Sequence, residues 1–445
     1  MNMLFNRQQL RALLVPLVIE QVLTGIMGVA DTLMVSNVGE AAISGVALVD
    51  SVNLLFIYFF SALAAGGTIV CAQYVGRDDR EDTNRAARQV TLACFALAFV
   101  LGVLLILARR PLLRLIFGNV EPAVMEAAVV YMLITAASYP FLAVYTAGAA
   151  LFRAIGDANR PMFVAAGADV MNVVGNALFI FVFRWGVMGA ALSTLLSRIA
   201  GAAVMLRLQN RNPAIALGDV RKLRPDMAMI RRILRVGLPN AVENGMFQFG
   251  RLMVQSTVST LGTTAIAVQA IVTTLELFGS MPAQAVGTGL LTVAGQCIGR
   301  GLPDQARYYM KKLTRISTVI VAAMGLLICV PAPLFMRLTA LTPEGGALAC
   351  RILWAVMMYK IVLWPTAFTL PNGMRAAGDV TYAMWVSTLS MWIFRVALSW
   401  ALCRFTGLGL WGVWIGWCTD WLVRGLCFRL RFRSGRWLDH SVLDG

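Results

Sequence analysis

Long apolar stretches dominate this sequence and restrict its fold more than any other feature. Each reaches the roughly 20 residues that an α-helix needs to cross the hydrocarbon core of a bilayer. Hydrophobic residues make up 59% of the chain and charged residues 13%, which excludes an ordinary soluble multidomain protein. The stretches lack the alternation of barrel strands, so we predict an all-α polytopic membrane protein. Twelve can be delimited, at residues 10–36, 43–74, 86–108, 122–152, 161–183, 187–207, 232–260, 264–296, 310–334, 345–371, 380–403 and 408–430.

Basic residues are concentrated in the short connections between these stretches and give the chain a net charge of +16. The positive-inside rule places both termini in the cytoplasm and leaves no separate basic domain to bind a nucleic acid. The longest connection falls in the middle of the chain. We therefore predict an N-terminal six-helix bundle over 1–206, a cytoplasmic linker over 207–231, and a C-terminal six-helix bundle with a short cytoplasmic tail over 232–445.

Short motifs in the first half of the chain return in the second half, displaced by 222 to 226 residues. Each copy holds six predicted spans, an even number, so both begin on the same side of the membrane. A pseudo-two-fold axis along the membrane normal is then expected to relate the two bundles. Such bundles enclose a cleft that opens to either side in turn, which favours a transporter, although channels and membrane enzymes can also be duplicated. The clearest pairs are PLVIE and PNAVE, QYVGR and QCIGR, and FRAIGD and MRAAGD.

The first predicted span contains two carboxylates, Glu20 and Asp31. A charge in hydrocarbon costs about 2.5–3.5 kcal/mol or more, so such residues usually face a bundle interior or a wet cavity. Eleven residues at about 100° each return to nearly the same helix face, so both side chains can line one side. The alternative is that each carboxylate lies near an end of the span and reaches water.

The fifth predicted span carries Asp169, Asn172 and Asn176 on one face. Facing Asp31, they would supply carboxylate and amide oxygens, the ligands that hard cations prefer. We therefore predict a cation-coupling site for H⁺ or Na⁺ made of these four residues and Glu20. Intramembrane amides also serve as structural hydrogen bonds between helices, and that alternative stays open.

Polar side chains also follow one face of the seventh predicted span, which indicates the wall of a wet cavity. A polar seam that ties two helices together is the alternative. Further intramembrane charges occur in other spans, and some of these are expected to neutralise one another. The predicted substrate-binding residues are Glu243, Asn244, Gln248, Arg251 and Gln255 of the seventh span, together with Glu276 and Asp50.

Catalytic and metal chemistry have little support in this sequence. The single histidine, His440, lies in the polar tail, so no histidine cluster can form. No nucleophile arrangement or paired-acid motif appears either. We expect neither an enzyme nor a bound cofactor or metal beyond the coupling ion.

Taken in order and duplicated, these motifs resemble the multidrug and toxic compound extrusion (MATE) family over nearly the whole chain. The resemblance rests on Pro16 followed by GVADTLMVSNVGEAAISG, on QYVGR, FRAIGDANRP, NVVGNALFIF and WGVMGAALST, and on their second-half echoes. It implies a twelve-helix exporter of the bacterial inner membrane. Such a protein expels amphiphilic, often cationic compounds in exchange for H⁺ or Na⁺ by alternating access, and we expect it to act as a monomer.

The family's first-helix acidic residue falls on Asp31. One branch keeps an asparagine and an acid in the fifth helix, which fall on Asn172 and Asn176, so the acid is an amide here. The seventh-helix glutamate of another branch falls on Phe247, one turn beyond Glu243, and its tenth-helix acid is missing. These departures leave the coupling ion open.

Two other functions remain as alternatives. A flippase for a lipid-linked saccharide, built on a related bundle fold, would need a cleft rich in cations, and Arg251, Lys360 and Arg395 are compatible with one. A passive channel would need a filter, which the sequence does not contain in recognisable form.

Overall fold

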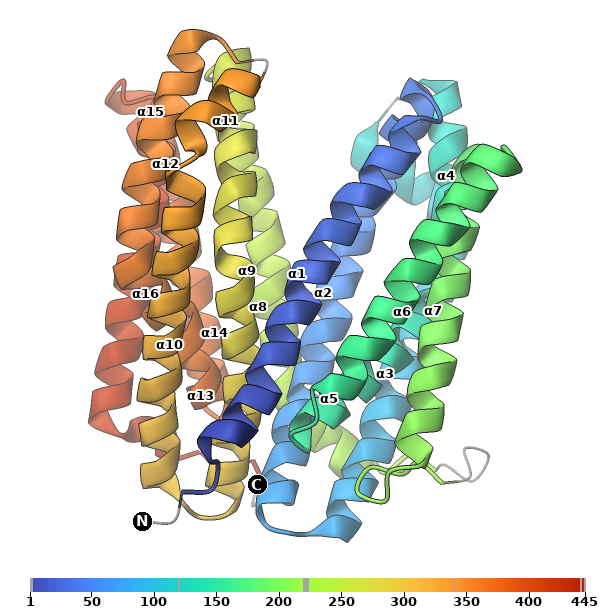
Figure 1. The fold of residues 1–445 in the computed structure, drawn as a ribbon, viewed down its shortest axis with the longest axis vertical. Helices are drawn as coiled ribbons and strands as arrows, with labels where there is room; N and C mark the ends of the chain where they lie inside the picture. The colour runs from blue at the N-terminus through green and yellow to red at the C-terminus, as the bar shows by residue number, and fades with distance from the viewer. Residues whose placement is uncertain (1–2, 119–120, 219–223, 340, 441, 444–445) are drawn as a thin grey trace. The chain divides into compact units, whose positions relative to one another are not determined.

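The computed structural model describes residues 3–118, 121–218, 224–339, 341–440 and 442–443 (Figure 1). All regular secondary structure within these ranges is helical. The first half of the chain contains α1 (Arg7–Ser36), α2 (Glu40–Gly76), α3 (Arg80–Phe117), α4 (Pro122–Ala137), α5 (Tyr139–Ala154), α6 (Asn159–Asn176), η1 (Ala177–Val182) and α7 (Gly186–Asn210).

The second half begins with α8 after the central connection and ends in a short 3₁₀ turn. Its elements are α8 (Met227–Ser259), α9 (Thr263–Gly299), α10 (Pro303–Cys329), α11 (Ala332–Leu338), α12 (Pro343–Trp364), η3 (Pro365–Thr369), α13 (Leu370–Ala376), α14 (Val380–Ser390), η4 (Met391–Leu398), α15 (Ser399–Phe405), α16 (Leu410–Ser434) and η5 (Arg436–Leu438).

The helices account for the twelve predicted segments. Nine helices in the described part of the chain are long and apolar enough to cross a membrane, and α4 and α5, bent by 45°, form a tenth span. Helices α8 and α16 occupy the remaining two segments, and both contain charged or amide side chains that lower their hydropathy. The prediction of a twelve-helix, all-α membrane protein is confirmed.

The internal repeat is visible in the helix boundaries. Helices α2 and α9 are both 37 residues long. Each is preceded by a glycine with a positive φ, 132° at Gly39 and 95° at Gly262, a conformation that costs any residue with a Cβ atom. The two glycines stand 23 residues after Pro16 and Pro239, each of which lies inside a helix.

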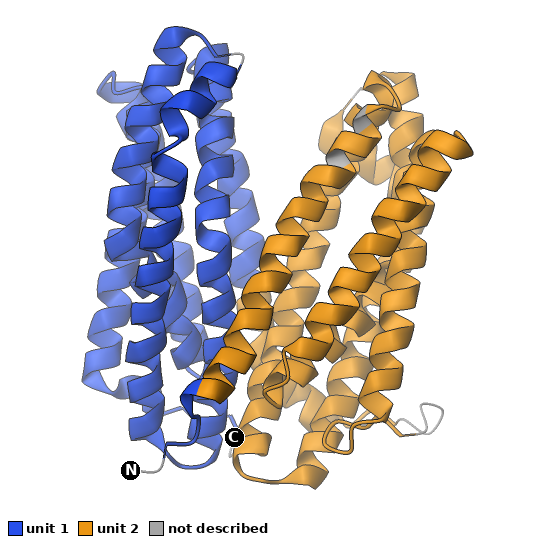
Figure 2. Cartoon of the chain, in the orientation of Figure 1, with its two compact units in different colours: residues 1–7, 242–445 blue, residues 8–241 orange. Residues whose placement is uncertain are grey.

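The helices form two compact units, which Figure 2 colours separately. Unit 2 contains residues 8–241, and unit 1 contains residues 1–7 and 242–445. The described part of the central connection belongs to unit 2, because it packs on α3. The amide of Gln89 donates to the carbonyl of Arg224 at 2.9 Å, and Arg85 pairs with Asp226 at 2.5 Å. A hydrogen bond from the backbone N–H of Met229, and then Arg85, holds the pKa of Asp226 below its usual value.

Each unit is held together by packing that the apolar composition makes possible. In unit 2, a Cβ atom on Gly66 of α2 would lie 2.6 Å from the backbone of Gly237 in α8, so these two helices touch through their glycines. In unit 1, the buried rings of Trp414, Trp417 and Trp421 on α16 join a continuous aliphatic core. Side chains in this core are fixed well enough to position the charged groups beside them.

Candidate functional site

Asp31 on α1 is half-buried in unit 2, where it accepts a hydrogen bond from the side-chain amide of Asn176 on α6. Asn176 is fully buried. The same amide nitrogen also lies 3.4 Å from Oδ1 of Asn172, one turn earlier on α6. The structure therefore brings together three of the five residues predicted to bind the coupling ion.

Hydroxyl groups on α7 hold Asn172 in place. The amide of Asn172 donates to Oγ of Ser193 at 3.4 Å and to Oγ1 of Thr194 at 3.3 Å, and Ser193 donates back to the carbonyl of Asn172 at 2.7 Å. Among the residues with described positions, Oδ1 of Asn176 is buried and accepts no hydrogen bond. An oxygen without a donor beside a carboxylate is suited to a cation.

Asp50 on α2 belongs to the same group of residues, although the sequence placed it with the substrate-binding set. It interacts electrostatically with Asp31, and it is hydrogen-bonded to the amide of Asn53 at 3.2 Å and to the hydroxyl of Tyr131. The hydroxyl of Tyr139 donates to Oδ1 of Asn53 at 2.6 Å. Asp50 is thus held by groups on α2 and α4 and faces the first-helix carboxylate.

Arg198 on α7 supplies the positive charge of this cluster. Its guanidinium donates to Oγ of Ser138, at the bend between α4 and α5, at 2.6 Å. It also interacts electrostatically with both Asp31 and Asp50. We call Asp31, Asp50, Arg198 and the two α6 asparagines the unit 2 cluster. Two carboxylates face one guanidinium, so the cluster carries a net charge of −1 when both acids are ionised.

Glu20 and Asp169 lie apart from this cluster. Glu20 is 7% exposed and pairs with Arg153 at the end of α5, with 2.6 Å between Oε1 and the guanidinium nitrogen. Asp169 is half-buried and interacts electrostatically with Glu20. A shared helix face therefore did not bring Glu20 to the same partners as Asp31, because the two residues lie about 16 Å apart along α1.

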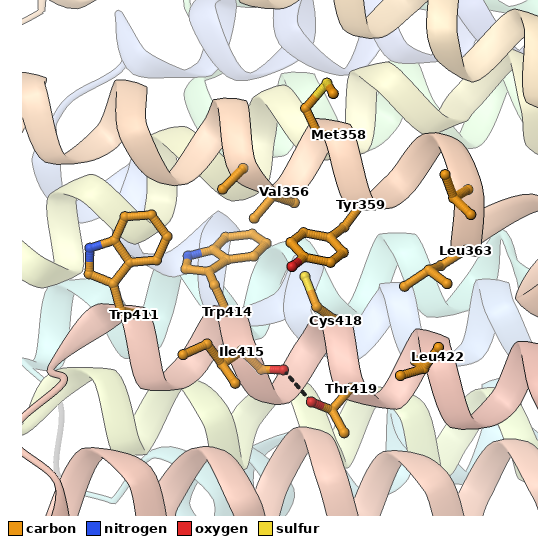
Figure 3. A pocket seen from close by; sticks show the side chains of 12 residues that line it. Val356, Met358, Tyr359, Leu363, Trp411, Trp414, Ile415, Cys418, Thr419 and Leu422 are labelled. Atoms are coloured by element: carbon orange, nitrogen blue, oxygen red, sulfur yellow. Dashed lines mark hydrogen bonds between the residues drawn. The ribbon is translucent and has the colours of Figure 1, made fainter.

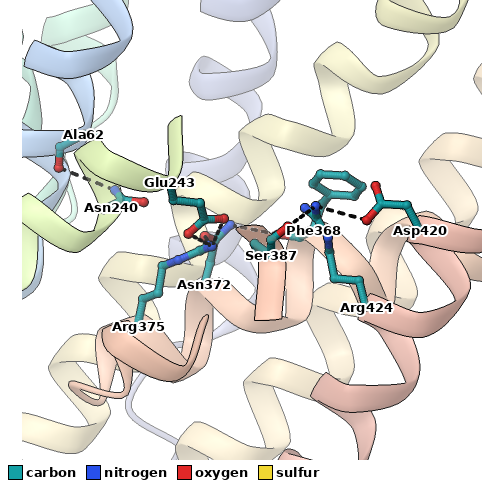
Figure 4. A network of polar contacts seen from close by, with 9 residues as sticks. All are labelled: Ala62, Asn240, Glu243, Phe368, Asn372, Arg375, Ser387, Asp420 and Arg424. Atoms are coloured by element: carbon teal, nitrogen blue, oxygen red, sulfur yellow. Dashed lines mark hydrogen bonds and ion pairs between the residues drawn. The ribbon is translucent and has the colours of Figure 1, made fainter. Parts of the chain in front are cut away.

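The pairing of Glu20 has a duplicate in unit 1. Glu243 of α8 accepts two hydrogen bonds from Arg375 of α13, at 2.7 and 2.8 Å, and Arg375 also donates to Asn372 at 2.8 Å (Figure 4). Both glutamates end the repeated PLVIE and PNAVE motifs, and both arginines belong to the FRAIGD and MRAAGD motifs. The repeat thus conserves an ion pair that ties the start of each copy to its middle.

A second charged cluster lies in the interior of unit 1. Lys360 of α12 is fully buried and bonds to Oε1 of Glu276 at 2.5 Å and to the carbonyl of the same residue at 2.6 Å. Asp420 of α16 pairs with Arg395 at 2.8 Å and with Arg424 at 3.3 Å. We call these five residues the unit 1 cluster. Three cations and two carboxylates give it a net charge of +1.

Aromatic rings surround the two guanidinium groups of the unit 1 cluster. The guanidinium carbon of Arg395 lies 4.8 Å from the ring centre of Phe247 and 4.5 Å from that of Trp417. The guanidinium carbon of Arg424 lies 4.8 Å from the ring centre of Phe368 (Figure 4) and 5.2 Å from that of Phe247. Ring faces stabilise cations that have lost water, which helps to explain how both guanidinium groups remain in an apolar bundle.

The other residues predicted for the seventh span are less enclosed than Glu243. Asn244, Gln248 and Arg251 are half-buried, and Gln255 is exposed. The predicted substrate-binding set is therefore divided. Asp50 belongs to the unit 2 cluster, and Glu276 is half of a buried ion pair with Lys360.

Several charged residues of these clusters were missed in the sequence. Arg198 is the only charged residue from position 185 to 206, and Asp420 and Arg424 are the only ones from 405 to 428, which marked them as intramembrane charges. Arg153 and Arg375 lie at the same place in duplicated motifs, which could have identified them as partners of the duplicated glutamates.

The sequence of this chain is similar to those of known proteins over nearly its whole length. A family model described as MatE matches the chain twice, at residues 16–178 and 239–401, which confirms the internal repeat. A protein of Thermotoga maritima named "Probable multidrug resistance protein NorM" is 27% identical over 447 residues, covering 98% of this chain and 94% of that protein.

Solved structures give the same result for the fold. A crystal structure of a MATE in complex with MaL6 aligns with a TM-score of 0.89 at 22% identity, over 96% of each chain. A MOP superfamily transporter from Pyrococcus furiosus, for which reverse polarity of the binding pocket suggests a different function, aligns with a TM-score of 0.89 at 21% identity. That alignment covers 98% of this chain and 97% of the other.

Proposed function

This chain belongs to the MatE family, and on that premise we propose that it is a secondary active exporter of amphiphilic, often cationic compounds. It acts by alternating access and exchanges its substrate for H⁺ or Na⁺. The MatE match, the NorM relative and the spanning helices support transport across a membrane. The ion, the substrate class and the direction are parts of the proposal.

One observation carries the coupling mechanism: Asp31 is held by Asn176 inside a cluster that lacks one positive charge. A bound proton or Na⁺ supplies that charge. Leaving the cluster at −1 in an apolar bundle is costly, so the helices that carry these groups pack differently in the loaded and empty states.

The ligands available to the ion are oxygens on α1, α2 and α6. Carboxylate oxygens of Asp31 and Asp50 and the unpartnered Oδ1 of Asn176 suit Na⁺, and either carboxylate accepts a proton. When the ion leaves, the Asn176 amide and Arg198 are the remaining partners of Asp31. Ion binding and helix packing are therefore linked, and exchange follows if the substrate favours the packing that the ion disfavours.

We further propose that the protein lies in the bacterial inner membrane with both termini in the cytoplasm. The basic connections and the tail support this orientation through the positive-inside rule. Each unit holds its own charged cluster, so one chain contains everything that the mechanism uses, and we propose a monomer.

Dye efflux from proteoliposomes, with pH and Na⁺ gradients imposed separately, tests this function. We expect ethidium efflux to follow one of the two gradients, and Asp31→Asn to lower the gradient-driven rate at least tenfold while the protein stays folded. Asp304→Asn is the matched control, because Asp304 is an exposed carboxylate in the first turn of α10. Undiminished efflux by Asp31→Asn would show that Asp31 does not couple transport to the ion.

A second candidate has support from the unit 1 cluster. Its net charge of +1 suits an anionic group, such as that of a lipid-linked saccharide, better than a cationic drug. The Pyrococcus furiosus transporter, for which reverse polarity of the binding pocket suggests a different function, shares this fold. Efflux of an anionic dye but not of ethidium in the same vesicles would favour this candidate.

A further inference from the structure

A basic pocket of about 370 Å³ lies in unit 1 between α10, the η3–α13 segment and α16. Lys311 and Arg315 enter it from α10, and Arg429 and Arg433 enter it from α16. Phe432 and the buried Leu370 form part of its lining. The pocket is at the end of unit 1 where α16 leads into the polar C-terminal tail.

The four cations of this pocket have no acidic partners in the described part of the chain. All four are exposed, and the ammonium of Lys311 lies 5.9 Å from the ring centre of Phe432. The hydroxyl of Thr314, which also lines the pocket, is buried and makes no hydrogen bond to a described residue. Four like charges beside an unused hydroxyl are the arrangement that a phosphate group satisfies.

An apolar groove of about 580 Å³ lies between α12 and α16 (Figure 3). Helix α12 runs directly into the η3–α13 segment that lines the basic pocket, and α16 lines both sites. The lining of the groove includes Met358 and Tyr359 from α12 and Trp411 and Leu422 from α16. Leu422 lies seven residues before Arg429 on α16, which is about 10 Å along the helix. The basic pocket and the groove are therefore close enough for the polar and apolar parts of one lipid molecule.

We propose that the basic pocket and the apolar groove together bind one anionic phospholipid from the bilayer. Its phosphate lies among Lys311, Arg315, Arg429 and Arg433, and an acyl chain lies in the groove between α12 and α16. Basic pockets between spanning helices are typical binding sites for acidic lipid headgroups. A free phosphate ion would use the cations but would leave the adjoining groove unfilled, so the bilayer is the favoured source.

Lipid binding to the purified full-length protein tests this site. The delipidated protein is mixed with equal amounts of dioleoylphosphatidylglycerol and dioleoylphosphatidylcholine, and bound lipids are counted by native mass spectrometry. The wild type is expected to retain dioleoylphosphatidylglycerol in preference to dioleoylphosphatidylcholine. At about fivefold per lost cation, Arg429→Gln with Arg433→Gln should weaken that binding about 25-fold.

The matched control removes two exposed arginines of unit 1 that do not line the pocket, Arg300 and Arg337. Arg300→Gln with Arg337→Gln should leave binding within about twofold of the wild type, and the lysine variants Arg429→Lys with Arg433→Lys should retain most of it. Equal retention of both lipids by the wild type, or equal losses in the glutamine pair and the control pair, would overturn the proposal.

Two further ligands distinguish the source of the phosphate. Inorganic phosphate at the same molarity should not displace dioleoylphosphatidylglycerol, and the dihexanoyl form should bind at least tenfold more weakly because its chains do not fill the groove. Displacement by inorganic phosphate would refute a lipid site, and equal binding of the two chain lengths would refute the role of the groove. Neither result depends on transport activity.

Discussion

Removing the cation from the buried Lys360–Glu276 pair should destabilise unit 1 strongly. Glu276 is 4% exposed. In Lys360→Met, its carboxylate loses the counter-ion that lies 2.5 Å away, and its backbone carbonyl loses the ammonium donor at 2.6 Å. Breaking a buried pair by removing one partner costs about 3–5 kcal/mol, because an uncompensated charge stays in the interior. The double variant Lys360→Met with Glu276→Leu removes both charges and should lie within about 2 kcal/mol of the wild type.

The duplicated pairs provide an internal scale for this reasoning. Side chains of Arg375 and Glu243 are 11% and 10% exposed, and those of Arg153 and Glu20 are 19% and 9% exposed, against 0% and 6% for Lys360 and Glu276. Water screens a partly exposed charge, so Arg375→Met and Arg153→Met should each cost about 1–3 kcal/mol. The loss of unfolding free energy should be largest for Lys360→Met and smallest for Arg153→Met.

Unfolding of the purified variants in mixed micelles of dodecyl maltoside and sodium dodecyl sulfate, followed by tryptophan fluorescence, measures these differences. A double-mutant cycle for Lys360 and Glu276 should give a coupling free energy above about 2 kcal/mol. If the double variant loses as much unfolding free energy as Lys360→Met and Glu276→Leu combined, the two residues do not stabilise the fold as a pair. If Lys360→Met, Arg375→Met and Arg153→Met lose equal amounts of unfolding free energy, burial does not control the cost.

Two further predictions concern unit 2. Asn176→Asp adds a carboxylate to the unit 2 cluster, whose net charge is already −1, so it should tighten Na⁺ binding by at least fivefold. Isothermal titration of the purified protein measures this affinity. An unchanged affinity would argue that Asn176 is not an ion ligand. Gly66→Ala places a methyl group 2.6 Å from the backbone of a neighbouring helix, so the overpacking cost of about 1–3 kcal/mol should exceed the gain of about 1 kcal/mol in helix propensity. Gly245→Ala is the control, because open space surrounds this glycine, and it should be neutral or stabilising. Unfolding in the same micelles measures both variants.

The helices were predictable because hydrophobic length alone determines them in a bilayer. The bend between α4 and α5 was not predicted, because hydropathy shows residues 122–152 as one apolar stretch although Pro140 lies at the bend. Its position matters because Ser138, at the bend, accepts the hydrogen bond from Arg198. Proline lacks a backbone N–H and clashes with the carbonyl four residues earlier, so Pro140 accounts for the break, which hydropathy does not register.

The candidate site was predictable only in part, because a sequence shows which face of its own helix a residue occupies but not which helix lies opposite. Asp31 was found as an intramembrane charge, and Asn176 as its facing amide. Glu20 occupies the same face as Asp31 yet pairs with Arg153. The internal repeat could have identified this pairing. The glutamate of PLVIE and the arginine of FRAIGD both return in PNAVE and MRAAGD, which indicates that the two charges contact each other within each copy.

The duplicated ion pairs separate scaffold from function. Glu20 with Arg153 and Glu243 with Arg375 have the same chemistry in both copies and are neutral in both. A pair that survives duplication unchanged serves a purpose that both copies share, which is to hold the start of each bundle to its middle. Neither glutamate is therefore the best candidate for binding an ion or a substrate.

The two charged clusters behave in the opposite way. Arg198 and Arg424 stand at the 226-residue offset of the last repeated motif, so they are equivalent positions, and both are arginine. Around them the copies diverge: Asn53, beside Asp50 in unit 2, corresponds to Glu276 in unit 1 at an offset of 223. One cluster carries a net charge of −1 and the other +1, although both are built at equivalent places on one scaffold. Two different ligands would select for this divergence in charge at a shared position, which supports our proposal that the coupling ion binds in unit 2. An anionic substrate, the second candidate, is the one that the charge of the unit 1 cluster would favour.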